Sequence, residues 1–280
     1  MATKALYDSI STKLSKQITR KYSTSFSLGI QMLNPSIRPG IFAIYGFVRL
    51  ADEIVDTFIG YDQKVLLEEF IEDTKKAIDR KISLNPVLND FQKVVNDYHI
   101  EWELIQCFFD SMETDLYKNT HNQQSYEQYI MGSAQVVGLM CLRVFCKGKK
   151  EAYANLKEGA MSLGAAFQKV NFLRDFEADT QGLDRTYFPN LAFNTLTEEA
   201  KKEIELDIEN DFRMALISIK QLPKEARFGV YTAYIYYFML FEKIKGLPTH
   251  QLREERVRIP NYRKMMLLVQ SKTQITFNLI

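Results

Sequence analysis

Seven prolines divide this sequence into segments whose apolar residues recur at helical spacing. Proline interrupts a helix interior because it lacks a backbone N–H and its ring clashes with the preceding turn. Between the prolines, apolar residues recur every three or four positions, and no alternation typical of a β-strand persists. The prolines are Pro35, Pro39, Pro86, Pro189, Pro223, Pro248 and Pro260. The pattern predicts an all-α protein with helices over residues 3–18, 20–31, 37–58, 63–80, 85–99, 101–117, 125–146, 150–178, 197–220, 224–245 and 260–275.

Composition excludes several classes of protein. The chain has 280 residues and no Pro-, Gly- or Ser-rich linker, so we expect one all-α domain over residues 1–280. A net charge of +1 provides no basic footprint for nucleic acid. Three cysteines without metal-ligand spacing fit a reducing cytoplasm. No apolar run reaches the roughly 18 residues of a membrane span, and no signal-peptide core is present. The expected location is therefore cytoplasmic.

Two pairs of aspartates carry the strongest chemical signal. Asp52 and Asp56 form one pair, Asp175 and Asp179 the other, and each pair is spaced four residues apart within a predicted helix. This spacing places both carboxylates of a pair on one helix face. Because Mg²⁺ is usually held by one or two carboxylates together with substrate phosphates, two facing pairs predict a site for Mg²⁺ and a diphosphate. The first predicted loop after the second pair, about 180–196, is a candidate cover for that site.

Each aspartate pair belongs to a longer polar stripe on a mostly apolar helix. The first stripe is Tyr45, Arg49, Asp52 and Asp56, and the second is Gly164, Gln168, Asn171, Asp175 and Asp179, with Arg174 beside it. A single DxxxD pair is usually only a solvated helix face. Two pairs in apolar helices, each in register with groups suited to metal or phosphate, favour an ion-containing site instead, because burying unpaired charges is costly. Gly164 is expected to leave room for a substrate.

Four segments together resemble the squalene/phytoene synthase family, from about Tyr22 to Lys264. Ser23–Phe26 resembles the family's N-terminal serine-rich substrate loop, and Ala43–Asp56 resembles its first aspartate signature. Tyr129–Gly138 resembles the central tyrosine helix. Gln168–Asp179, followed by Asp184–Pro189, resembles the second signature and its RxYxP tail. In detail the chain is most similar to bacterial phytoene synthases of carotenoid pathways.

The resemblance also has departures. Tyr22 and Thr24 stand where many relatives have histidine and a basic residue, which could alter diphosphate contacts. Gln135 replaces a common glycine in the central helix, which could alter the cavity shape. Tyr237 is preferred over Tyr236 as the family's C-terminal tyrosine.

The resemblance implies an all-α isoprenoid (trans-prenyl) synthase fold around a large central cavity. It implies head-to-head condensation of two geranylgeranyl diphosphates to phytoene, through a cyclopropyl diphosphate and with release of pyrophosphate. Mg²⁺, or Mn²⁺ in its place, would bind Asp52, Asp56, Asn171, Asp175 and Asp179 and stabilise the leaving group; no NADPH is expected. The implied catalytic residues are the four aspartates, Arg49 and Tyr129. The implied substrate-binding residues are Tyr22, Ser23, Ser25, Tyr45, Arg49, Gln168, Asn171, Arg174 and Tyr237.

A carbocation reaction also needs a dry cavity with aromatic walls. The candidates are Phe26, Phe42, Tyr45, Tyr129, Phe172 and Tyr237, although ordinary core packing explains most aromatic residues. His99, His121 and His250 are far from both aspartate pairs in sequence and are expected to be satisfied or surface histidines. A lipid substrate is compatible with peripheral contact at a membrane. The residues give no indication of oligomeric state.

Three alternatives stay open. The first is squalene or dehydrosqualene synthesis from farnesyl diphosphate; the absence of a GxGxxG fingerprint and of a C-terminal membrane anchor favours phytoene synthase over squalene synthase. The second is a non-catalytic helical assembly factor of the same fold, which would be expected to lose some of the aspartates. The third is a di-iron carboxylate protein, which would carry Glu-x-x-His pairs that this sequence lacks.

Overall fold

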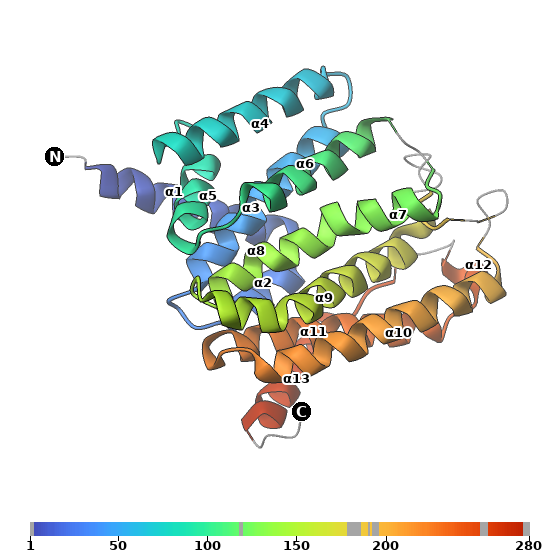
Figure 1. The fold of residues 1–280 in the computed structure, drawn as a ribbon. Coiled ribbons are helices and arrows are strands. Elements are labelled where there is room, and N and C mark those ends of the chain that lie inside the picture. The colour runs from blue at the N-terminus through green and yellow to red at the C-terminus, as the bar shows by residue number, and fades with distance from the viewer. Residues whose placement is uncertain are drawn as a thin grey trace.

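The computed structural model describes residues 3–117, 120–177, 186–189, 191, 196–252 and 257–276. These residues form helices throughout, and their extended backbone pairs only at one isolated bridge between Thr120 and Thr186, which confirms the predicted all-α class (Figure 1). The helices are α1 (Lys4–Tyr22), α2 (Thr24–Gln31), α3 (Arg38–Asp56), α4 (Gln63–Arg80), α5 (Pro86–Tyr98), α6 (Trp102–Tyr117), α7 (Gln123–Ile130), the π-helix η1 (Met131–Gln135), α8 (Val136–Phe145), α9 (Lys150–Glu177), α10 (Glu198–Gln221), α11 (Lys224–Lys245), α12 (Thr249–Leu252) and α13 (Asn261–Thr276).

The first predicted helix boundary was wrong by about four residues. α1 continues to Tyr22, and the chain breaks at Ser23, whose backbone is extended (φ −142°, ψ 108°). The Ser23 side chain accepts a hydrogen bond from the Phe26 backbone N–H at 3.1 Å. Ser23 is therefore an N-cap, which explains why a serine cluster without proline starts a new helix here.

The predicted helix over residues 125–146 is interrupted by η1. Gly132 allows this segment to approach α6 closely, because a Cβ there would lie 2.5 Å from the Cys107 carbonyl oxygen. A π-helical turn adds one residue to a helix and is common at functional sites. The sequence analysis also did not predict the short helix α12, which precedes α13.

Aromatic packing fixes the position of α3. The Phe47 ring is fully buried and stacks on Phe91 of α5, with ring centroids 3.8 Å apart. Phe108 and Phe109 of α6 contact the same ring at 5.6 and 5.4 Å between centroids. Since this face of α3 is held by α5 and α6, the face that carries the aspartates turns the other way.

A buried cation fixes the rotation of α9. Lys169 is 7% exposed, and its Nζ lies 2.8 Å from an Asp211 oxygen and 2.5 Å from an Asp207 oxygen, both on α10. Because neighbouring residues on a helix point about 100° apart, Lys169 directs Gln168 away from α10.

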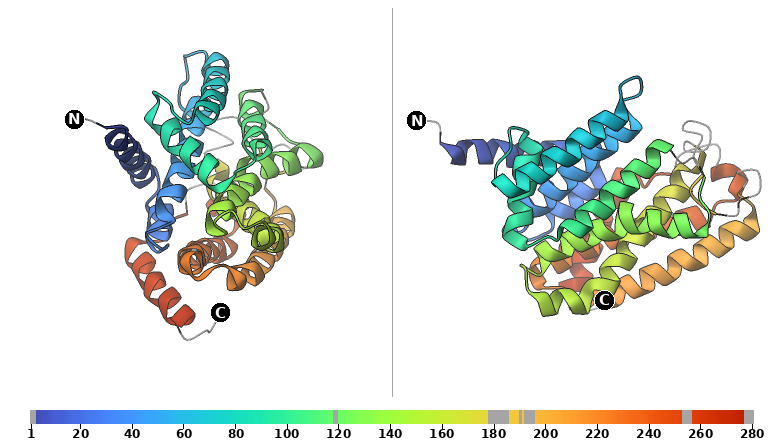
Figure 2. Two further views of the ribbon diagram at one scale, coloured as in Figure 1. Left: turned by 60° about the vertical axis from the view of Figure 1, so that its left-hand side comes forward. Right: turned by 45° about the horizontal axis from the view of Figure 1, so that its top comes forward.

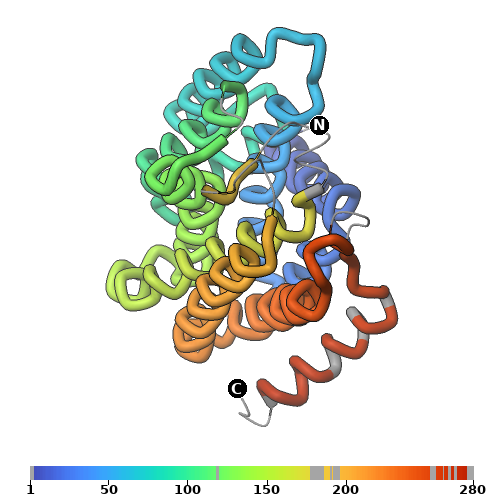
Figure 3. Tube along the Cα trace, turned by 90° about the vertical axis from the view of Figure 1, so that its right-hand side faces the viewer, coloured from blue at the N-terminus to red at the C-terminus, as the bar shows by residue number. Residues whose placement is uncertain are grey.

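Figure 2 shows α1 at one edge of the molecule in both views. Figure 3 shows the N-terminal helices in blue above the C-terminal helices in orange and red. None of the described helices combines the length and the apolarity needed to cross a membrane.

Candidate active site

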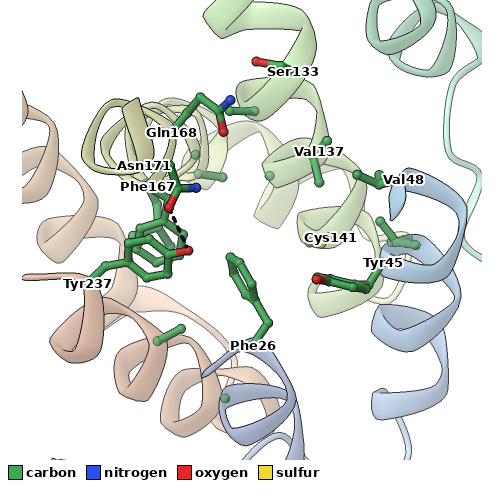
Figure 4. Close-up of a pocket in the computed structure, with 18 of the residues that line it drawn as sticks. Phe26, Tyr45, Val48, Ser133, Val137, Cys141, Phe167, Gln168, Asn171 and Tyr237 are labelled. Atoms are coloured by element: carbon green, nitrogen blue, oxygen red, sulfur yellow. Dashed lines mark hydrogen bonds between the residues drawn. The ribbon is translucent and has the colours of Figure 1, made fainter. Parts of the chain in front are cut away.

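One cavity of about 570 Å³ opens between these helices, within the usual range for ligand pockets. Side chains from α2, α3, α8, α9 and α11 point into the same space (Figure 4). Twelve of the predicted site residues line it: Tyr22, Ser23, Tyr45, Arg49, Asp52, Asp56, Tyr129, Gln168, Asn171, Arg174, Asp175 and Tyr237. Ser25 is not among the lining residues, and Asp179 lies outside the described residues.

The stripe on α3 forms the first polar wall. Tyr45, Arg49, Asp52 and Asp56 all face the cavity. The Arg49 guanidinium pairs with Glu53 through Nη2 and lies 4.4 Å from the centre of the Tyr22 ring. Its Nε is buried and has no hydrogen-bond partner. A buried donor of this kind is costly unless a ligand satisfies it, so Arg49 is suited to an anion in the cavity.

Asp52 is the most perturbed carboxyl group on this wall. Burial, and then the Asp56 carboxylate, raise its pKa from the ordinary 3.8 to about 7, although Arg49 opposes the shift. The side chain is 29% exposed, but that exposure is to the cavity, and protein surrounds the carboxyl group on its other sides. An excess of negative charge in such a place favours binding of a cation.

The second polar wall comes from α9. Gln168, Asn171 and Asp175 face the cavity, as the spacing predicts. Arg174 pairs with Asp175 through two hydrogen bonds, Nε–Oδ1 at 3.0 Å and Nη2–Oδ2 at 2.5 Å. This bidentate pair holds a guanidinium at the cavity wall beside the carboxylate.

Gly164 lies between the cavity and the neighbouring helix. A Cβ there would lie 2.5 Å from the carbonyl oxygen of Ala134 in η1, so its missing side chain makes room for that helix. Because Gly164 also lines the cavity, the expectation that it makes room for a substrate stays a prediction.

Tyr237 joins α11 to the α9 wall. Its hydroxyl donates to the Asn171 Oδ1 at 3.4 Å, and its ring stacks on Phe167 with centroids 4.0 Å apart (Figure 4). Burial raises the pKa of Tyr237 to about 12, so the hydroxyl stays protonated. Tyr236 is not among the lining residues, which agrees with the preference for Tyr237.

Tyr129 lies in a buried aromatic group at the same end of the cavity. Its hydroxyl donates to Asp115 Oδ2 at 2.7 Å, and burial raises its pKa well above 10. The Tyr187 ring lies 5.1 Å from Tyr129 and stacks on Phe172 at 4.0 Å. Tyr187 belongs to the predicted RxYxP tail, of which Arg185 lies outside the described residues, as does most of the predicted cover loop.

The sequence reasoning missed Asp115. Asp115 lines the cavity, and its charge also raises the pKa of Asp52. It follows Phe108 and Met112 by seven and three residues, so its position on the apolar face of α6 was a readable signal. His121 is 8% exposed, and its ring lies 5.2 Å from Tyr129. Its distance in sequence from the aspartates was therefore a poor guide to its place.

The rest of the cavity lining is mostly apolar, with Ser133 and Ser218 as its polar members. Ile41 of α3 and Leu156 of α9 lie far along their helices from the aspartates, and Leu142, Phe145 and Leu222 also line the cavity. Leu156 precedes Asp175 on α9 by about 28 Å, at the helical rise of ~1.5 Å per residue. The cavity thus has a polar end and a long apolar end.

The polar end has the donor set of a magnesium–phosphate site. The described residues contain no group of three acidic, histidine or cysteine side chains close enough to form a metal site alone. Mg²⁺ needs only one or two carboxylates when substrate phosphates supply the other ligands. Asp52, Asp56, Asn171 and Asp175 offer carboxylate and amide oxygens around one space. The pKa of Asp52 is raised first by burial and then by the Asp56 carboxylate, whose charge a cation would neutralise. These residues fit the ion.

Comparison with known proteins gives the same picture. A phytoene synthase from Arthrospira platensis is 25% identical over 92% of this chain and 91% of its own length. A presqualene diphosphate synthase from Sinorhizobium fredii is 30% identical over 59% of this chain and 58% of its own length. A solved dehydrosqualene synthase superposes with a TM-score of 0.80 at 19% identity, over 96% of this chain and 98% of the other, so the fold is that of the isoprenoid synthases. The family described as squalene/phytoene synthase, whose members are prenyltransferases, matches residues 19–263, and the chain belongs to that family.

Proposed function

We propose that the protein condenses two geranylgeranyl diphosphates head-to-head to phytoene, in carotenoid biosynthesis. The observation that carries the proposal is one cavity that is lined by aspartates of α3 and α9 and by a long, mostly apolar wall. The 25% identity to a phytoene synthase over nearly the whole chain supports the same substrate.

The polar end would ionise the allylic diphosphate. Mg²⁺ held by Asp52, Asp56, Asn171, Asp175 and Asp179 would supply positive charge to the leaving diphosphate. Arg49 would donate its free Nε to a phosphate oxygen, and Arg174 would lie beside the same group. Tyr22, Ser23, Tyr45 and Gln168 line the surrounding wall and would orient the diphosphate. Ser25 is not among the residues that line the cavity. Its predicted role in substrate binding therefore requires a substrate that extends beyond this lining.

The aromatic walls would protect the carbocation that remains. Phe26 lies among Tyr45, Phe167 and Tyr237, with ring centroids 5.5 to 6.0 Å away. Such faces stabilise cations and exclude water, which would quench the intermediate. Tyr129 would stay neutral beside Asp115 and contribute a polarised hydroxyl near the reacting carbons.

The chain of steps is balanced without a reductant. Loss of the first diphosphate joins the two prenyl chains in a cyclopropyl diphosphate, and one proton leaves. Loss of the second diphosphate allows rearrangement to the C1'–C1 bond, and a second proton leaves with formation of the central double bond. Released pyrophosphate is the natural proton acceptor, because it is the strongest base formed in the cavity.

The second candidate function uses farnesyl diphosphate and gives squalene, dehydrosqualene or presqualene diphosphate. The observation in its favour is the similarity to a presqualene diphosphate synthase and to a dehydrosqualene synthase. A catalytically inactive assembly role is less well supported, because Asp52, Asp56 and Asp175 all face the cavity.

One set of incubations tests the proposal. Purified protein with Mg²⁺ receives either geranylgeranyl or farnesyl diphosphate, each with and without NADPH, and the hydrocarbons are identified by mass spectrometry. A C40 product formed without NADPH is expected. A C30 product from farnesyl diphosphate alone would replace the proposed substrate by the second candidate.

A further inference from the structure

The N-terminal helix is packed in an unusual way. The buried residues of α1 are all polar: Ser11, Ser15 and Thr19, each fully buried. Its outer face instead carries Leu6 and Ile10, which are 52% and 48% exposed. Further along α1, Leu14 and Ile18 are partly buried and pack against the core, as the apolar stripe of a surface helix ordinarily does. Leu6 and Ile10 do not take part in that packing.

Hydrogen bonds and close backbone approach hold α1 in place. Ser15 packs against Gly46 of α3, where a Cβ would lie 3.2 Å from the Ser15 Cβ. Thr12 donates to Asp90 Oδ1 at 2.6 Å, and Asn89 donates to Asp8 at 3.0 Å. These contacts, together with the partly buried Leu14 and Ile18, attach α1 to the rest of the protein, so Leu6 and Ile10 are available for another contact.

The turn between α4 and α5 places two more apolar side chains beside the start of α1. Ile82 is 45% exposed and Leu84 is 99% exposed. The turn is nevertheless well held, because the Tyr7 hydroxyl lies 2.8 Å from the Ser83 carbonyl oxygen and 2.9 Å from that of Leu84. The Asn85 N–H also donates to the Ser83 hydroxyl at 3.1 Å. A turn that is held in place and still exposes a leucine indicates a contact site more strongly than an isolated surface leucine does.

The net charge around these side chains is positive. Residues 4–22 and 79–85 carry seven Lys or Arg and two Asp, a net charge of +5, whereas the whole chain carries +1. Lys13, Arg20 and Lys81 are exposed. Along the outer face of α1, Lys13 continues the line of Leu6 and Ile10, and Arg20 follows further along the same side.

We propose that this surface, consisting of Leu6, Ile10, Lys13, Arg20, Ile82 and Leu84 and called here the α1 surface, docks on an anionic lipid bilayer. Apolar side chains surrounded by Lys and Arg match the acyl and headgroup layers of such a membrane. The apolar residues sit on the start of a helix and on a turn at the edge of the molecule (Figure 2).

The helix that carries the α1 surface continues directly to the cavity. α1 ends at Tyr22, which lines the cavity and packs on Arg49. A membrane bound along α1 would therefore lie near one edge of the site. The inference goes beyond the proposed function and does not depend on it, because it rests on α1 and the α4–α5 turn alone.

Vesicle binding tests the inference. The full chain is floated with vesicles of phosphatidylcholine alone or of equimolar phosphatidylcholine and phosphatidylserine. We expect binding only to the anionic vesicles. Leu84→Ser should weaken it by about 10-fold, because the acyl layer loses one leucine. The triple variant Lys13→Gln/Arg20→Gln/Lys81→Gln should weaken it by about 5-fold per cation removed.

Matched variants separate the α1 surface from general stickiness. Leu206→Ser removes a leucine that is 66% exposed on α10, and Lys150→Gln/Lys157→Gln/Lys202→Gln removes three exposed cations elsewhere. Both should bind as the wild type does, and circular dichroism should show that every variant is folded. Equal losses in the matched variants, or no binding by the wild type, would overturn the inference. Self-association that Leu84→Ser abolishes, without vesicle binding, would assign the surface to a second copy instead.

Discussion

The two ends of the cavity differ in what they determine. At the polar end, Asp52, Asp56 and Asp175 line the cavity together with Arg49 and Arg174. At the other end the lining is aliphatic and aromatic, without a charged group among the residues described there. The polar end accounts for a reaction class, ionisation of a diphosphate, whereas the apolar end accounts for the length of chain that fits. A change at one end should therefore leave the property of the other end intact.

The largest effect is expected from removing a charge at the polar end. Asp52→Asn and Asp175→Asn should each lower kcat by about 10³-fold, because the leaving diphosphate loses stabilisation worth about 4 kcal/mol. Turnover is measured as hydrocarbon formed. Asp110→Asn, which changes an exposed aspartate of α6, is the matched control and should be fully active. Near-normal turnover in either test variant would remove the aspartates from the mechanism.

Arg49 tests the anion contact at the same end. Arg49→Lys keeps the charge but loses the guanidinium fork and its buried Nε, so kcat/KM should fall about 30-fold. The length of the product should not change. Arg213→Lys, on the exposed side of α10, controls for the exchange itself. A change in product length by Arg49→Lys would contradict the division between the two ends.

The sequence predicted the polar end far better than the apolar end, for a physical reason. Charged residues in an apolar helix are costly to bury, so the stripe on α3 had to face a special environment. No comparable argument sorts the apolar residues of α8. Val137, Cys141 and Phe145 line the cavity, whereas Leu139 and Met140 pack in the core, and all five are apolar residues that a core would also accept.

Close helix contacts were likewise hidden. Helix positions followed from proline placement and apolar spacing, and they agree with the structure to within a few residues, apart from the α1–α2 boundary and α12. The π-helical turn and the role of Gly164 depend on how near η1 approaches α6 and α9. That distance is a tertiary property, and a glycine in a sequence does not say whether a ligand or another backbone fills the space beside it.

A substitution at the apolar end should alter the choice of substrate. Leu156→Phe narrows the cavity far from the aspartates, so kcat/KM for geranylgeranyl diphosphate should fall about 10-fold through overpacking. The value for farnesyl diphosphate should stay near that of the wild type, and the ratio of the two is the measurement. Equal losses for both substrates would indicate a general folding defect or a misplaced apolar end.

The smallest expected effect is on stability. Asp52 has a pKa of about 7 in the folded protein and an ordinary value of 3.8 when unfolded. Between these two pH values the folded state binds one proton more than the unfolded state does. The contribution of Asp52 to the stability of the metal-free protein is therefore largest below pH 3.8, and it is lost as the pH rises through 7. Asp52→Asn should therefore raise Tm at pH 8 by about 5 °C, for about 2 kcal/mol.

The same comparison at low pH is the control for this effect. At pH 4 the Tm difference between Asp52→Asn and the wild type should shrink, because Asp52 is then protonated in the folded protein. Asp110→Asn should show no such dependence on pH. A constant Tm difference across the pH range would mean that the pKa of Asp52 is not raised in the folded protein.

The most direct test of the polar end is the release of pyrophosphate from geranylgeranyl diphosphate as the divalent metal is removed and restored. Wild-type protein is treated with EDTA, and pyrophosphate is then measured before and after Mg²⁺ is added in excess. The aspartates that line the cavity predict no release without the metal and full recovery with it. Release that continues at the same rate in EDTA would contradict a metal-assisted ionisation at Asp52, Asp56 and Asp175.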